Sequence, residues 1–309
     1  MKRFKNILVA TDTRLDSQVI LNTAAEVAVN NNASLRIVDI VPDLSWATRL
    51  TLQDHQHVQD LLRKEKQQNL ESLAAPIREQ GISVETKLLE GKSSVEIVRE
   101  AIRGEHDLVV AVAKGNNSRH SGFFGHTARR LLRHCPTAVW LVAPEMVPQV
   151  KHVLACVDTS TDNSLDAELN DKVYELASSI STFQNSKLSV LHAWLMQDES
   201  LLSARLKPPV VEQYVTRERE HREKLLDKFL QQHESSRSSE NVHMVKGSTS
   251  EVVSNFVRDN AVDLVVMGTV ARSGLTGMLM GNTSEEVLDQ ISCSVLAVKP
   301  YSFKTPIKA

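Results

Sequence analysis

Four glycines stand close together in the segment 267–286, MGTVARSGLTGMLMGNTSEE. The whole chain has only 11 glycines. Glycine lets the backbone approach a ligand closely, and the Asn-Thr-Ser near the end of the segment is typical of a helix start, where free N–H groups bind anions. The segment therefore predicts a phosphate-binding loop. The residues leave one alternative open, a tight surface loop followed by an ordinary helix cap.

The loop follows a short apolar run, DLVV at 263–266, which has the composition of a buried strand. In an open parallel sheet, ligands bind beyond the carboxyl ends of the strands, where such a loop would lie. Two other phosphate-binding patterns are excluded. The GKSS at 91–94 has Thr86 where a P-loop needs its first glycine, and the sequence contains no GxGxxG.

The elements that would position this loop occur twice. KNILVATDT at 5–13 is repeated as KHVLACVDT at 151–159, and DLVV occurs at both 107–110 and 263–266. Apolar runs alternate with amphipathic helical patterns in each half, which is typical of parallel sheets covered by helices. We therefore predict an α/β protein of two tandem domains, 1–145 and 150–301. Each is a five-stranded parallel sheet with helices on both faces, of Rossmann-like type.

Composition excludes several classes of function. The 309 residues carry a net charge of −2 and only 4% aromatic residues, which argues against a general nucleic-acid binder. The three cysteines are widely spaced, the eleven histidines lack metal-ligand spacing, and no apolar run is long enough to span a membrane. These features favour a cytoplasmic protein with neither a protein-bound metal nor a membrane segment.

With its glycine loop and its repeat, the sequence resembles the universal stress protein family, in particular the tandem, E-type members. Nucleotide-binding members of that family carry Gly, two residues, Gly, nine residues, then Gly and a small polar residue. The second half keeps this spacing with Gly268 and Gly281, and has Ala271 at the second glycine. The first half has Val112 at the first position and keeps Gly115 and Gly125.

The resemblance implies that the second domain binds ATP, with magnesium present only on the nucleotide. The implied site residues are Val157, Asp158, Thr159, His192, Met267, Gly268, Val270, Ala271, Arg272, Gly281, Asn282, Thr283 and Ser284. A second, weaker site in the first domain would comprise Asp12, Gly115, Gly125, His126 and Thr127. The resemblance also implies pairing through the last strands, 139–143 and 295–299, as an intramolecular pseudo-dimer or between two chains.

We expect a stress-response protein that is regulated by its nucleotide, with no catalytic residues and at most weak ATP hydrolysis. Two alternatives stay open. One is an interaction or dimerisation protein that binds no nucleotide, which the departures at Val112 and Ala271 favour. The other is a binder of a different phosphate-bearing ligand with an apolar part, covered by the long segment 193–211.

Overall fold

The computed structural model describes residues 4–13, 18–42, 55–114, 123–143, 149–160, 163–270 and 280–308. These residues form two compact units. The N-terminal unit contains residues 4–149 together with 292–308, and the C-terminal unit contains 150–270 together with 281–291. Within the described ranges, no helix is long and apolar enough to cross a membrane.

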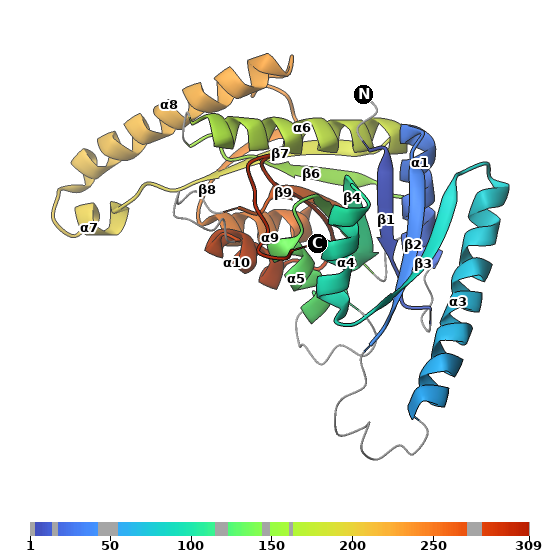
Figure 1. Ribbon diagram of the computed structural model, residues 1–309. Coiled ribbons are helices and arrows are strands. Elements are labelled where there is room, and N and C mark those ends of the chain that lie inside the picture. Colours follow the sequence, from blue (N-terminus) through green and yellow to red (C-terminus); the bar gives the residue numbers. More distant parts are fainter. Residues whose placement is uncertain are drawn as a thin grey trace. The chain divides into compact units, whose positions relative to one another are not determined.

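In the N-terminal unit, five parallel strands are ordered β3-β2-β1-β4-β5. Its elements are β1 (Asn6–Ala10), α1 (Gln18–Asn31), β2 (Ser34–Val41), α3 (His55–Glu79), β3 (Val84–Glu90), α4 (Ser93–Arg103), β4 (Leu108–Val112), α5 (His126–His134) and β5 (Ala138–Val142). The central strands β1 and β4 read NILVA and LVVAV and are almost entirely buried, as expected for strands covered on both faces. Figure 1 shows α1 and α3 beside β1, β2 and β3.

The last strand of the chain, β10 (Ser294–Val298), belongs by its packing to the N-terminal unit. It runs antiparallel to β5, with Val295 opposite Leu141, and the Ser294 hydroxyl accepts the N–H of Ala143 at 3.0 Å. The two segments that were expected to pair, 139–143 and 295–299, therefore do lie side by side.

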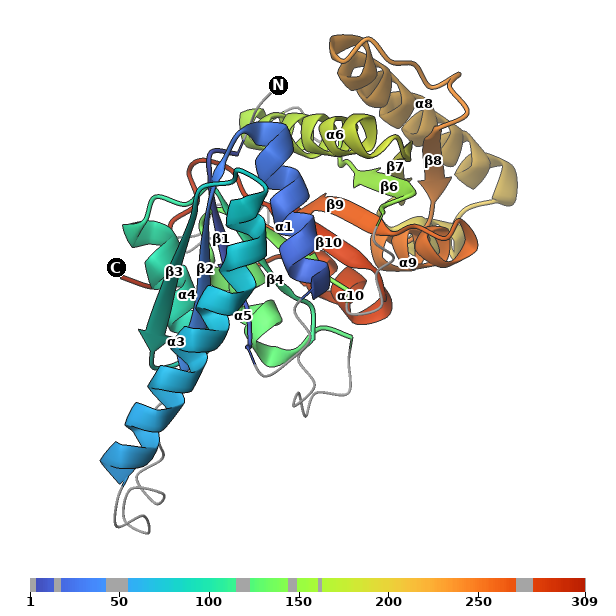
Figure 2. The ribbon, with the colours of Figure 1, turned by 90° about the vertical axis from the view of Figure 1, so that its right-hand side faces the viewer.

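In the C-terminal unit, the strands are ordered β9-β6-β7-β8 and are all parallel. Its elements are β6 (His152–Cys156), α6 (Ser164–Gln184), β7 (Lys187–Trp194), α7 (Glu199–Ser203), α8 (Pro208–Gln232), β8 (Val242–Lys246), α9 (Thr249–Asp259), β9 (Leu264–Gly268) and α10 (Asn282–Gln290). Helices α6 and α8 lie on one side of these strands, and α9 and α10 on the other (Figures 1 and 2).

The two units repeat the same local structure. Asp107, just before β4, accepts the N–H groups of Lys5 and Asn6, and Asp263, just before β9, accepts those of Lys151 and His152. The α/β class with a mainly parallel sheet is confirmed. The predicted limits 1–145 and 150–301 follow the sequence repeat, whereas the packing places β10 with the first half.

Candidate functional site

Three strands of the C-terminal unit end at the same edge of the sheet. Cys156 of β6 lies level with Leu191 of β7 and with Met267 of β9. His192 is therefore one step past that level on β7, and Thr159 and Thr269 follow shortly after the ends of β6 and β9. Because the strands are parallel, this edge is where the fold places a ligand.

Three buried polar atoms at this edge have no hydrogen-bond partner within the part of the chain that the structure describes. They are Oγ1 of Thr159, Nε2 of His192 and Oγ1 of Thr269. Thr159 is 5% exposed, and His192 and Thr269 are fully buried. A buried polar atom without a partner costs roughly 1–3 kcal/mol, so such atoms are rare unless a ligand or water completes them. Five other buried polar atoms of the described residues also lack a partner, so what distinguishes these three is that they lie together at the edge where parallel sheets bind ligands.

His192 is held neutral in a defined orientation. Its Nδ1 lies 3.3 Å from the carbonyl oxygen of Val157. Burial lowers the pKa of His192 to about 4, with a smaller contribution from the nearby positive charge of Arg222. A carbonyl oxygen only accepts hydrogen bonds, so Nδ1 carries the ring proton and Nε2 keeps its lone pair.

The loop after β6 is fixed by a side-chain clamp. Asn170 of α6 accepts the N–H of Asp158 and donates to its carbonyl oxygen, both at 2.8 Å. The exposed Asp158 carboxylate accepts the N–H of Ser160 at 3.1 Å, and Arg222 of α8 donates to the Ser160 carbonyl oxygen at 3.1 Å. This clamp sets the position of Thr159 between two fixed residues.

Gly268 allows α6 to pack closely on the end of β9. A Cβ atom at this position would overlap Cδ2 of Leu169 and lie 2.8 Å from its Cγ. The Gly268 carbonyl oxygen also accepts the hydroxyl of Ser284 at 3.3 Å. The first glycine of the predicted loop therefore has a packing role whether or not a ligand lies nearby.

The Asn-Thr-Ser segment predicted as the cap region of a helix forms the first turn of α10 instead. Gly281 is its N-cap, with φ −71° and ψ 143°, and its N–H donates to the Thr269 carbonyl oxygen at 3.2 Å. Asn282 and Thr283 form an exposed first turn, and Ser284 is buried. Thr269 is thus tied to the start of the helix whose N–H groups would face an anion.

The other predicted residues lie as follows. Val157 and Met267 are buried and Val270 is partly exposed. Ala271, Arg272 and Gly115 lie outside the described residues. The structure brings Thr159, His192, Gly268 and the start of α10 to one edge, and it adds Thr269.

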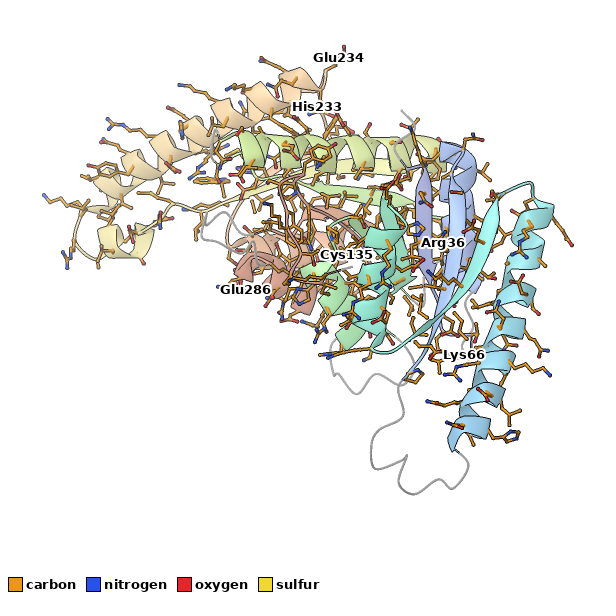
Figure 3. The ribbon with its side chains drawn as sticks, in the orientation of Figure 1. Arg36, Lys66, Cys135, His233, Glu234 and Glu286 are labelled. Carbon is orange, nitrogen blue, oxygen red and sulfur yellow. The ribbon has the colours of Figure 1, made fainter. Side chains whose placement is uncertain are left out.

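In the N-terminal unit, the corresponding edge of the sheet carries a buried ion pair. Asp39 takes the place in the repeat that His192 has in the second half. It accepts Nζ of Lys66 at 2.6 Å, and both the N–H and the hydroxyl of Thr13 at 2.9 and 2.6 Å. Asp39 and Lys66 are both buried. Lys66 lies on the side of α3 that faces the strands (Figure 3), and Asp12 is 3.8 Å from its Nζ.

The start of α5 in this unit resembles that of α10. Gly125 is the N-cap, with φ −71°, and its N–H donates to the Ala113 carbonyl oxygen at 2.8 Å. His126 is exposed and Thr127 is half-buried in the first turn. Gly125, His126 and Thr127 of the predicted weaker site therefore form a helix start like that of α10. At the ends of β1 and β2, however, this unit has the buried ion pair of Lys66 and Asp39.

Sequence reasoning missed Asp39, Lys66, Asn170 and Thr269. A signal for Asp39 was present, since it is the one charged residue of the buried run IVDIV at 37–41. Lys66 and Asn170 each lie within an amphipathic helix that carries many other polar residues, so nothing in their sequence neighbourhood distinguishes them. Thr269 stands directly after a buried strand, where polar side chains commonly meet ligands.

Comparisons with known proteins found matches over nearly the whole chain. The sequence profile of the universal stress protein family matches residues 3–143 and 149–299. The chain is 26% identical to universal stress protein E of Photorhabdus laumondii and 24% identical to that of Escherichia coli K12, covering 100% of this chain and 99% and 98% of those proteins.

Two solved structures share the fold. The protein PA1789 of Pseudomonas aeruginosa, described as functionally unknown, has a TM-score of 0.75 at 22% identity, over 97% of this chain and 94% of that one. A universal stress protein of Archaeoglobus fulgidus has a TM-score of 0.64 at 16% identity, over 95% and 98%. At these identities the likeness concerns the fold alone.

Proposed function

Because this chain belongs to the universal stress protein family, with two tandem repeats of its domain, we propose that its C-terminal unit binds an adenine nucleotide. The nucleotide serves as a regulatory ligand in the stress response that this family membership supports, and ATP carrying magnesium is the form proposed. The observation that carries the proposal is the group of three unpartnered, buried polar atoms at one sheet edge: those of Thr159, His192 and Thr269.

The residues at this edge fit such a ligand by chemistry. The hydroxyls of Thr159 and Thr269 donate and accept, which suits ribose hydroxyls or phosphate oxygens. The first turn of α10, with Gly281, Asn282 and Thr283, offers backbone N–H groups and suits the phosphates. His192 offers an acceptor on a neutral ring, which suits a base rather than a phosphate.

We propose a regulatory rather than a catalytic role because Asp158 and Arg222, the charged side chains described beside this edge, already have structural partners. The Asp158 carboxylate accepts the N–H of Ser160. Arg222 forms an ion pair with Glu218 at 2.6 Å and donates to the Ser160 carbonyl oxygen. Phosphoanhydride hydrolysis needs a positioned water and charge stabilisation, and these two residues serve the loop instead. We propose the cytoplasm as the place of action, since that is where free ATP is abundant.

Thermal unfolding in the presence of millimolar ATP tests this proposal. A ligand that binds only the native state raises the unfolding temperature, so ATP should raise that of the wild type. Gly281→Asp places a carboxylate at the N-cap of α10, where it suits the helix but repels phosphate. The ATP-dependent rise should disappear in this variant.

The N-terminal unit offers a matched control, because Gly125 is the N-cap of α5 with the same φ of −71°. Gly125→Asp introduces the same charge at the equivalent position and should keep the ATP-dependent rise. If ATP leaves the wild-type unfolding temperature unchanged, the nucleotide proposal is wrong.

A second candidate is an interaction protein, which exposed apolar side chains of the C-terminal unit favour. The segment 193–211 contains α7 and the start of α8 rather than a simple loop. Its Leu195 and Leu201 are 54% and 51% exposed, and Tyr214 of α8 is 46% exposed. Mass spectrometry of the purified protein separates the candidates: a released nucleotide supports the first, and a co-purified protein without nucleotide supports the second.

A further inference from the structure

We propose that two copies of this chain pair through strand β8 of the C-terminal unit, antiparallel to each other about a two-fold axis at Met244. This pairing joins the sheets of two C-terminal units edge to edge. Strand β8 is the last in the order β9-β6-β7-β8, and Figure 2 shows it as the outermost of these strands. The inference goes beyond the proposed function and does not depend on a bound nucleotide.

The outer side of β8 presents backbone groups that β7 does not bind. At the end of β8, the N–H of Gly247 points to β7 and donates to the Trp194 carbonyl oxygen at 2.9 Å. The backbone groups of successive residues in a strand point to alternate sides, so those of Met244 and Lys246 point away from β7. Within the part of the chain that the structure describes, no strand lies on that side. Such a row of N–H and carbonyl groups is a template for pairing with another chain.

The first repeat protects its equivalent edge with charge. Strand β3 is the last strand of the N-terminal unit, and it carries Glu85, Lys87 and Glu90, each of which forms an ion pair. Charged side chains along an edge oppose pairing with a second strand. Strand β8 reads VHMVK, and its only lysine or carboxylate is Lys246 at its last position. The edge at β8 therefore lacks the protection that β3 has.

The two ends of the β8 edge carry opposite charges. Glu240 is exposed in the turn just before β8, and Lys246 is exposed at its end. In an antiparallel pair centred on Met244, Lys246 of one copy lies opposite Val242 of the other and diagonal to Glu240, within reach of long side chains. The two-fold axis makes this contact occur twice. The edge is thus complementary to itself, and the occupant that it fits is a second copy of this chain.

Exposed apolar side chains surround the same end of β8. Val245 is 37% exposed. Lys246 donates to Glu199 of α7 at 2.6 Å, which holds α7 beside the end of the strand. Leu195, just after β7, and Leu201 of α7 are both exposed. Pairing of two short strands is marginal in water by itself, and burial of these side chains adds the apolar area that stabilises it.

Sedimentation velocity of the full chain over a range of concentrations tests the pairing. We expect a dimer, and Lys246→Glu should raise its dissociation constant at least about tenfold, because both contacts with Glu240 become repulsive. Adding Glu240→Lys to Lys246→Glu restores opposite charges and should bring the constant back toward that of the wild type. The single and double variants both lose the contact with Glu199, so the recovery reports on the contact between copies. A wild type that is monomeric at every concentration, or a double variant that dimerises no better than Lys246→Glu, overturns the proposal.

A proline variant tests the backbone pairing. Met244→Pro removes an N–H from the outer side of β8 and should abolish the dimer. Leu88→Pro is the matched control in β3, because Leu88 and Met244 each stand three residues before the glycine that follows the strand. It should leave the dimer intact. Circular dichroism establishes that both variants are folded, and a folded Met244→Pro protein that still dimerises like the wild type contradicts the proposal. If Met244→Pro does not fold, the exchange of charges between Glu240 and Lys246 decides.

Discussion

Lys66 of α3 donates to Asp39 of β2 across 2.6 Å, and both side chains are buried. This pair lies, in the N-terminal unit, at the edge where the C-terminal unit has two buried atoms, Nε2 of His192 and Oγ1 of Thr159, without a partner among the described residues. The two repeats therefore share the β-α order of their main elements but differ in the side chains at the carboxyl ends of their sheets: an ion pair in the first, and a neutral histidine and a threonine in the second.

Removing one partner of this pair should destabilise the protein strongly. Lys66→Met leaves a buried carboxylate without its cation, and breaking such a pair lowers the free energy of unfolding by about 3–5 kcal/mol. Urea denaturation measures the loss. Lys64→Met, at an exposed lysine of the same helix, should change the free energy by less than about 0.5 kcal/mol.

A second variant shows that the lost stability comes from the unpaired charge. Adding Asp39→Asn to Lys66→Met removes that charge while Thr13 keeps an oxygen to donate to, so the double variant should be more stable than Lys66→Met alone. Equal stability of the single and double variants would mean that Lys66 acts through packing rather than through its charge.

Much of the fold could be predicted from the sequence because apolar runs and their repetition depend on local composition. The apolar residues of DLVV at 107–110 and 263–266 lie in β4 and β9, and the helix predicted after the glycine loop is α10. The assignment of β10 to the N-terminal unit could not be predicted in this way, since the repeat places it in the second half and only its packing against β5 moves it.

The candidate site was predictable only where a residue's role depends on its own strand or loop. Thr159 and His192, which stand near the ends of β6 and β7, were among the predicted residues. The contact of Lys66 with Asp39 joins residues 27 positions apart, and that of Asn170 with Asp158 joins a helix to a loop. Such pairings depend on how a helix rotates over its sheet, which no local pattern records.

Gly268→Ala should destabilise the C-terminal unit through a clash with α6. The added Cβ atom would lie 2.8 Å from Cγ of Leu169, and overpacking of this kind costs about 1–3 kcal/mol. Urea denaturation of the variant gives the loss. Leu169→Ala in the same chain makes room for the added methyl group. The double variant should therefore lose less free energy of unfolding than the two single variants lose in sum. Strict additivity would show that Leu169 is not what the glycine accommodates.

His192 should make stability fall in mild acid. Its pKa is about 4 in the folded protein against 6.5 for the free side chain. Between these values the unfolded chain binds the proton and the native state does not, so the contribution is complete above pH 6.5 and is lost as pH falls to 4. The loss amounts to about 3 kcal/mol.

The difference between wild type and His192→Phe isolates this effect from other titrating groups. Denaturation at pH 7 and at pH 4 should show the wild type losing about 3 kcal/mol more than the variant. His126→Phe, at an exposed histidine, serves as the control and should lose as much as the wild type. A variant that loses as much stability as the wild type would mean that His192 is protonated in the native state.

Lys299 should act in the opposite range of pH, because its charge is buried at the C-terminal end of α5. Burial lowers the pKa of Lys299 to about 8, from 10.5 for the free side chain. Its Nζ donates to the Leu132 carbonyl oxygen at 2.6 Å and lies 4.2 Å from the centre of the Phe303 ring. Between pH 8 and 10.5 the unfolded chain holds the proton and the native state has released it, so stability rises with pH in this window.

The wild type should therefore gain about 3 kcal/mol relative to Lys299→Met between pH 7.5 and 10.5, whereas an exposed-site control, Lys304→Met, should follow the wild type. A constant difference between wild type and Lys299→Met across this range would show that the ammonium stays charged in the native state, held by the Leu132 carbonyl oxygen and the Phe303 ring.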